Sequence, residues 1–90
     1  MLLDHMFNEI ESRSLKLIES NNYMVEYCDE DTDILEAIKE NFQILLHNQF
    51  LLERLLERLG EKITCKHLKD YEDRLQSFRQ KLAIAKRDMP

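Results

Sequence analysis

Residues 33–60 decide the fold, and they read DILEAIKENFQILLHNQFLLERLLERLG. Apolar side chains recur there at steps of three and four, with a single glutamine in the series: Leu35, Ile38, Phe42, Leu45, Gln49, Leu52, Leu56 and Leu59. A repeat that averages about 3.5 residues over more than three heptads is typical of a helix that packs lengthwise against other helices. The pattern predicts a helix from about residue 34 to residue 59.

Both ends of this stretch carry residues that favour helix termini. Asp33 stands where an N-cap residue is expected, and Glu36 follows three residues later as the second member of a capping box. Gly60 comes directly after the last apolar residue, where a glycine in the left-handed conformation often ends a helix. We therefore expect the helix to begin after Asp33 and to end before Gly60.

A second apolar stripe follows on the C-terminal side, and it consists of Leu68, Tyr71, Leu75, Phe78, Leu82 and Ala85. This stripe predicts a helix over about 64–87, with Thr64 as its N-cap residue. Only residues 60–63 separate it from the preceding helix. Because so short a connection joins antiparallel neighbours, we expect the two helices to form a long antiparallel hairpin.

On the N-terminal side, a third stripe of Leu3, Phe7, Ile10, Ser14 and Leu17 predicts a shorter helix over about 2–20. Ser14 weakens this stripe, and Asn21-Asn22 is expected to end it. Residues 21–33 are rich in acidic side chains and are predicted to form an extended connector in which the rings of Tyr23 and Tyr27 pack.

The composition agrees with a single all-α domain over residues 1–90. The chain has one glycine and one proline, far fewer than a sandwich or a barrel uses in its turns. We predict a short N-terminal helix followed by the hairpin, assembled as a three-helix bundle or as a dimeric helical bundle.

A second apolar set flanks the stripe of the long helix and makes it wider than one neighbouring helix requires: Ile34, Ile44, Leu51 and Leu55. Either the first helix or a second subunit must cover this surplus, and we favour a homodimer because a domain of this size gains stability by pairing. For oligomerisation or partner binding the candidate residues are Ile44, Leu51 and Leu55. Gln49 is added because a buried amide can fix the register of paired helices.

Charge is distributed unevenly along the chain. The net charge is −5, but residues 1–33 contribute −7 and residues 61–90 contribute +3. This polarity suits an interaction tail, or an attraction between the two ends within one fold or between subunits.

No set of residues in the sequence predicts catalysis, a cofactor or a metal site. The acidic run from Asp29 has the acid spacing of a calcium loop, but Ile34 stands where that loop requires glycine. Cys65 and His67 are the one close pair of soft ligands, whereas a tetrahedral zinc site needs four convergent ligands. We expect Cys28 and Cys65 to be free thiols in a reducing, cytoplasmic setting. The longest stretch without charge, residues 41–52, is too short to span a membrane.

These observations favour a non-enzymatic protein–protein interaction module, a small helical adaptor, inhibitor or chaperone that acts through an apolar helical face. Its expected partners are a second copy of the chain and another protein. In size and in its helical hairpin the chain is similar to the small helical chaperones of flagellar and type III export systems, although no motif carries this comparison. The alternative is a regulator that contacts nucleic acid through the basic residues between Arg74 and Arg87.

Overall fold

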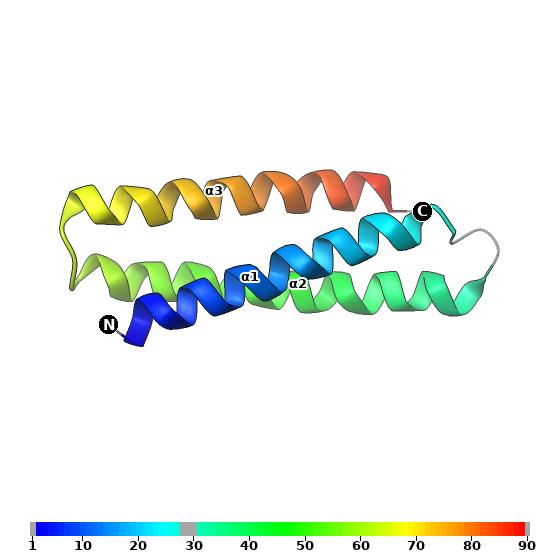
Figure 1. The fold of residues 1–90 in the computed structure, drawn as a ribbon, viewed down its shortest axis with the longest axis horizontal. Helices are drawn as coiled ribbons and strands as arrows, with labels where there is room; N and C mark the ends of the chain where they lie inside the picture. Colours follow the sequence, from blue (N-terminus) through cyan, green and yellow to red (C-terminus); the bar gives the residue numbers. More distant parts are fainter. Residues whose placement is uncertain (1, 28–30, 90) are drawn as a thin grey trace.

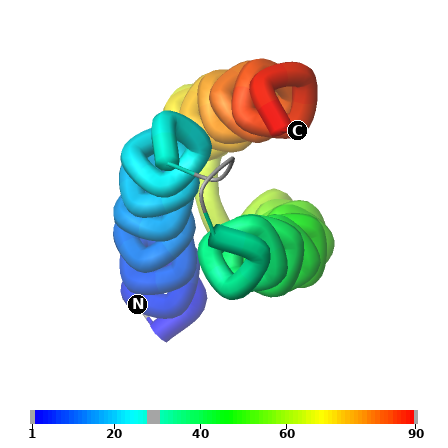
Figure 2. The backbone as a smooth tube through the Cα atoms, turned by 90° about the vertical axis from the view of Figure 1, so that its right-hand side faces the viewer, coloured from blue at the N-terminus to red at the C-terminus, as the bar shows by residue number. Residues whose placement is uncertain are grey.

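The computed structural model describes residues 2–27 and 31–89, which form three α-helices and no strand: α1 (Leu2–Val25), α2 (Thr32–Gly60) and α3 (Cys65–Asp88) (Figure 1). The predicted all-α fold is confirmed, as a three-helix bundle. α2 and α3 form the antiparallel hairpin, while α1 runs antiparallel to α2 and parallel to α3. Seen along the long axis, the helices occupy the corners of a triangle (Figure 2). The bundle measures 50 × 19 × 15 Å.

The core lies along the axis between the three helices. Its buried apolar side chains come from all three stripes, with Ile18 and Leu55 added from positions beside them: Phe7, Ile18, Ile38, Phe42, Leu45, Leu52, Leu55, Leu59, Leu75, Phe78, Leu82 and Ala85. Burial of one large apolar side chain stabilises a fold by about 1.5–3 kcal/mol. The periodicity therefore identified most of the apolar residues that are buried in the bundle.

α1 is longer than predicted. It continues through Asn21 and Asn22 to Val25, so Tyr23 is helical and does not belong to an extended connector. Asn21 does not stop the helix because its side chain finds partners on α2 and does not compete for the backbone of α1. The rings of Tyr23 and Tyr27 do pack together, with centroids 5.3 Å apart.

The first residue of α2 lies two positions before the predicted one. Asp31, and not Asp33, is the N-cap residue: its backbone is extended, and its Oδ1 accepts a hydrogen bond of 2.8 Å from the backbone N–H of Asp33. Asp33 lies in the first helical turn, where its negative charge suits the positive end of the helix dipole.

The end of α2 also differs from the prediction. Gly60 is the last helical residue and its φ is not positive, so the expected left-handed glycine cap is absent. The chain leaves the helix through tightened backbone bonds that span three residues, from the N–H of Glu61 to the carbonyl of Arg58 and from the N–H of Lys62 to the carbonyl of Leu59. Since no left-handed residue is needed for this exit, the conformational freedom of glycine is not used here.

α3 begins where the sequence predicts. Thr64 is its N-cap residue, with φ −73° and ψ 157°. Its hydroxyl makes no capping hydrogen bond and lies 2.9 Å from Nδ1 of His67 instead.

Candidate functional site on the outer face of α2

Two buried polar layers hold α1 against α2. In the first, the Ser14 hydroxyl donates to the carbonyl of Ile10 (2.7 Å) and accepts from Nδ2 of Asn48 (3.0 Å). In the second, Asn21 donates to the carbonyl of Ile38 (3.2 Å) and accepts from Nδ2 of Asn41 (3.0 Å). Because a buried polar group is costly without its partner, these layers specify the register of the two helices.

The sequence contains a signal for these layers that the apolar pattern does not include. Ser14 and Asn21 are seven residues apart, and so are Asn41 and Asn48. Polar residues one heptad apart on two antiparallel helices meet in matching layers. The prediction treated Ser14 as a weakness and Asn21 as a stop, although both are buried at the α1–α2 contact.

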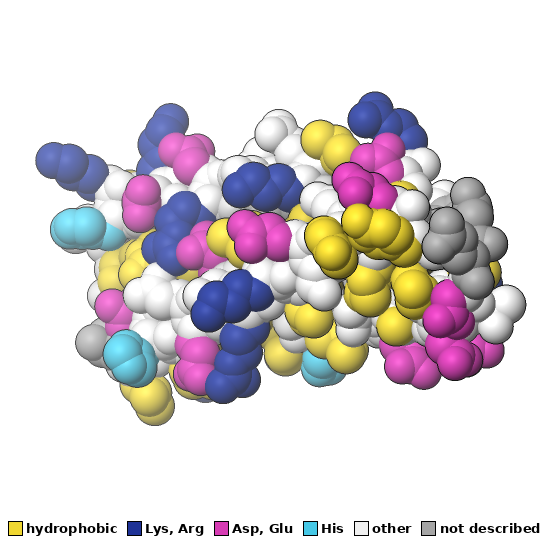
Figure 3. All heavy atoms as spheres, turned by 45° about the vertical axis from the view of Figure 1, so that its right-hand side comes forward, with side chains coloured by type: hydrophobic (Ala, Val, Ile, Leu, Met, Phe, Trp, Pro, Cys, Tyr) yellow, Lys and Arg dark blue, Asp and Glu magenta, His cyan; other side chains and the backbone are white. Residues whose placement is uncertain are grey.

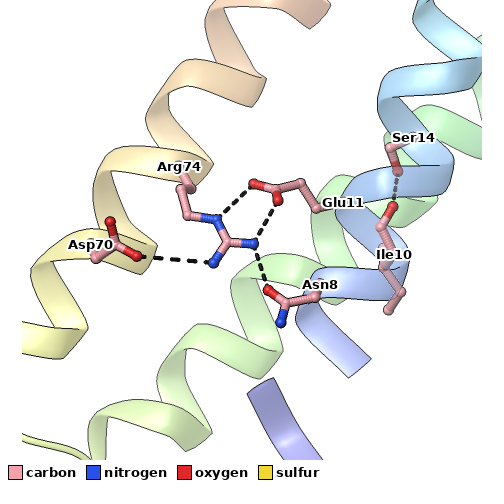
Figure 4. A network of polar contacts seen from close by, with 6 residues as sticks. All are labelled: Asn8, Ile10, Glu11, Ser14, Asp70 and Arg74. Carbon is pink, nitrogen blue, oxygen red and sulfur yellow. Dashed lines mark hydrogen bonds and ion pairs between the residues drawn. The ribbon is translucent and has the colours of Figure 1, made fainter. Parts of the chain in front are cut away.

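A guanidinium joins α1 to α3. Nε and Nη2 of Arg74 donate to the two carboxylate oxygens of Glu11 at 3.0 and 2.6 Å, and Nη2 also donates to Oδ1 of Asn8 at 2.6 Å (Figure 4). Asp70 lies 4.0 Å from Nη1 on the opposite side. The same guanidinium lies 5.0 Å above the ring of Phe7. One ion pair between the acidic first third and the basic last third of the chain is therefore formed inside the fold.

This environment favours the charged form of Arg74. Hydrogen bonding to Glu11 raises the pKa of Arg74, partial burial opposes the rise, and the nearby carboxylates of Glu11 and Asp70 add to it. Arg74 is therefore a structural cation that links two helices.

Gln49 lies on the side of α2 that faces α3. Its Nε2 donates to Oε1 of Glu53 at 3.1 Å, and the same carboxylate pairs with Arg79 of α3 at 3.2 Å. Gln49 also lines a groove of about 240 Å³ with Leu46 and Leu82. The amide thus has a partner in its own helix.

The other three candidate residues lie toward α1. Leu55 is buried in the core, Leu51 is half-buried, and Ile44 is 48% exposed. Leu51 and Leu55 line a groove of about 390 Å³ between α1 and α2, whose remaining walls are Met6, Ile10, Phe50, Arg54 and Arg58. The structure therefore separates the four predicted residues: α1 covers Leu55 within one chain, Ile44 and Leu51 border solvent, and Gln49 faces α3.

We define the outer face of α2 as the stripe that points away from the bundle axis: Glu36, Glu40, Ile44, His47, Leu51, Arg54 and Arg58. All except the half-buried Leu51 are exposed. Phe50 borders this stripe with 53% of its surface exposed, and the guanidinium of Arg54 lies 5.8 Å from its ring centroid. The outer face thus combines apolar side chains at its centre with charges toward both ends.

Apolar surface also occurs elsewhere on the molecule. In Figure 3, charged side chains of both signs extend from the end that holds the α2–α3 turn to the middle, and hydrophobic side chains gather toward the opposite end beside a group of acidic side chains. Ile84 on α3 is 49% exposed, close to the value for Ile44. Ile84 also lines a groove, of about 330 Å³, with Leu15 and Ile18 of α1. Neither exposure nor a groove distinguishes the outer face of α2, whereas its arrangement of charges does.

The described part of the chain holds no cluster of side chains suited to metal binding. Among residues 2–27 and 31–89, no three His, Cys, Asp or Glu side chains lie close enough to hold a metal ion. Cys65 is an exposed free thiol. Cys28 and the first acids of the calcium-like run, Asp29 and Glu30, lie outside the described residues.

Comparison with protein-family models, curated proteins and solved structures found no significant match. None of the three described helices is long and apolar enough to cross a membrane.

Proposed function

We propose that the protein is a non-enzymatic protein–protein interaction module, an adaptor, inhibitor or chaperone, which binds a helix through the outer face of α2 and the adjoining groove. One observation carries the proposal. Phe50 is about half exposed at a groove of about 390 Å³ that two guanidinium groups also line, and Ile44 is about half exposed on the same outer face.

The composition of this surface supports the proposal. Exposed aromatic and arginine side chains are enriched in protein interfaces and supply much of their binding energy. A bound helix would cover the apolar side chains of Met6, Phe50 and Leu51, each of which is at least partly exposed to solvent. The apolar floor and the basic lining select an amphipathic helix with acidic residues beside its apolar stripe.

We also propose a cellular compartment for the protein. The exposed thiol of Cys65 suits a reducing, cytoplasmic compartment, in which free cysteines persist. A surface lined by Phe50 and Leu51 suits a protein that spends part of its time with this face covered.

The alternative, a nucleic-acid regulator, has less support. Arg74 and Arg79 belong to the basic stretch of α3, but they are paired with Glu11 and Glu53. Electrophoretic mobility shift over a salt series tests this alternative, because binding to phosphates weakens steeply as salt rises. Salt-sensitive binding of a duplex at or below about 10 µM would favour it over the interaction module.

Photo-cross-linking tests the proposed function. A benzophenone amino acid replaces Phe50 on the outer face, and a matched control places it at Gln76, an exposed position on α3. In an extract of the native host we expect discrete protein adducts from position 50 that Arg54→Glu diminishes and that position 76 does not form. Identical adducts from both positions, or none from position 50, would overturn the proposal.

A further inference from the structure

The charges on the outer face of α2 are arranged symmetrically about His47. Glu40 precedes His47 by seven residues and Arg54 follows it by seven, while Glu36 precedes it by eleven and Arg58 follows it by eleven. Residues at equal distances from His47 thus carry opposite charges.

Helical geometry places these five residues on one face. At 3.6 residues per turn, steps of seven and eleven residues each return to within about 20° of the starting direction. Along the axis they correspond to about 10 and 16 Å on either side of His47. The five side chains are exposed, as a row on the surface requires.

The helix dipole does not account for the whole pattern. It favours acids in the first turn and bases in the last turn, and this explains Asp33 and Arg58. Its influence falls off within those turns, whereas Glu40 and Arg54 lie well inside the 29-residue helix. No described residue forms an ion pair with Glu36, Glu40, Arg54 or Arg58, so ion pairs within the chain do not account for these charges.

We propose that the outer face of α2 binds a second copy of this chain, with the two α2 helices antiparallel and His47 of each copy at the two-fold axis. Glu40 of one copy then faces Arg54 of the other, and Glu36 faces Arg58, so that four favourable charge pairs form in the dimer. A two-fold interface requires such self-complementarity. The inference rests on the proposed function, because it names the occupant of the same surface.

The apolar centre fits this arrangement. Ile44 precedes His47 by three residues and Leu51 follows it by four, and at about 100° per residue both lie on the same flank of the outer face. The two-fold axis therefore brings Ile44 of one copy toward Leu51 of the other. The groove beside Phe50 and Leu51 then receives the half-exposed Ile44 side chain. The acids of the same incoming helix reach Arg54 and Arg58, which line that groove.

Charge reversal tests the inference by sedimentation equilibrium of the purified full chain. Glu40→Arg or Arg54→Glu places like charges at two symmetric contacts, and we expect the dissociation constant of the dimer to rise about tenfold. The double variant Glu40→Arg/Arg54→Glu restores opposite charges and should return the constant to within about threefold of the wild-type value. Lys66→Glu, at an exposed position on α3, is the matched control and should leave it unchanged.

The outcomes separate this inference from the proposed function. In a parallel pair of α2 helices, residue 40 faces residue 40, so each single variant keeps a like-charge contact and leaves the dissociation constant unchanged. That result, or failure of the double variant to restore dimerisation, overturns the antiparallel arrangement. The wild-type chain could instead remain monomeric up to about 1 mM while position 50 still cross-links to another protein. That result would overturn the proposal that a second copy binds this face, and it would leave the proposed function standing. Far-UV circular dichroism verifies that each variant keeps its helices.

Disulfide cross-linking tests the antiparallel arrangement without relying on charge reversal. Native Cys28 and Cys65 are replaced by serine, and Glu40→Cys chains are mixed with Arg54→Cys chains that carry a size tag. Oxidation should join one chain of each kind in the antiparallel dimer. Disulfides that join only chains of the same kind would contradict it.

Discussion

The contact between Arg74 and Glu11 gives the sharpest prediction for the fold. Replacing Arg74 by Met keeps an aliphatic stem of similar length and removes the guanidinium. The bidentate pair with Glu11 is lost, together with the cation–π contacts to Phe7 and Tyr71 at 5.0 and 5.1 Å. We expect the bundle to become less stable, since the interactions with Glu11 and Phe7 cross the α1–α3 contact and the one with Tyr71 lies within α3, while α2 keeps its packing.

The expected loss of stability depends on how far the ion pair between Arg74 and Glu11 is exposed to solvent. Hydrogen bonds to charged groups contribute about 1.5–3 kcal/mol when well shielded, and exposed ion pairs about 0.2–1 kcal/mol. The side chains of Arg74 and Glu11 are 29% and 19% exposed, which places the pair between these limits. We expect a coupling of about 1 kcal/mol and a total cost for Arg74→Met of about 2 kcal/mol, once the cation–π contacts are included.

A double-mutant cycle measures the coupling. Urea unfolding of the wild type, Arg74→Met, Glu11→Gln and the double variant separates the interaction from the cost of each replacement. Because the pKa of Arg74 is raised, its stabilising effect is fully present below the ordinary pKa of the guanidinium and is lost only as pH rises through the folded value. The coupling should therefore be the same at about pH 7 and at about pH 9. A coupling below about 0.3 kcal/mol would refute the account of Arg74 as a link between helices.

Two further predictions concern positions where the structure departs from the sequence pattern. Gly60→Ala should stabilise the protein by about 0.5–1 kcal/mol, because Gly60 is helical and an added Cβ would lie 3.5 Å from Leu68, an ordinary contact. A lower melting temperature in differential scanning calorimetry would mean that residue 60 needs glycine after all. Asn21→Ala should cost about 1–2 kcal/mol, since Asn41 loses its acceptor, whereas Asn22→Ala at the exposed neighbour should change stability by less than about 0.5 kcal/mol. Equal losses in urea unfolding would contradict the buried polar layer.

Apolar periodicity was sufficient to predict the three helices and their core. The stripe that begins at Leu35 supplies most of the buried residues of α2, and the short connection before Thr64 correctly indicated the hairpin. These features depend on local spacing and on the area removed from water, both of which can be read along one chain.

The helix ends and the polar contacts depended on the tertiary structure. Asn21 resembles a helix stop in sequence, yet the carbonyl of Ile38 on α2 gives it a partner and α1 continues. Gly60 resembles a left-handed cap, yet the tightened exit from α2 needs none. Whether a polar residue ends a helix or joins two of them is decided by what lies across from it, and the sequence alone does not contain that information.

The structure shows where the four candidate residues lie, and their role in binding stays a prediction. Ile44 and Leu51 do border solvent on the outer face, but Leu55 is covered by the fold and Gln49 lies toward α3. The symmetric charges of Glu40 and Arg54 were visible in the sequence. That these two charges lie on the face of α2 that the other helices leave exposed could be seen only in the structure.

Methyl NMR over a concentration series tests most directly whether the outer face of α2 is an interface. Ile44 and Ile84 are 48% and 49% exposed, so each serves as the control for the other. From about 20 µM to about 1 mM, the methyl signals of Ile44 should shift progressively while those of Ile84 stay fixed, and Arg54→Glu should suppress the shift. Signals of Ile44 that do not move, or signals of Ile84 that move equally, would contradict the account.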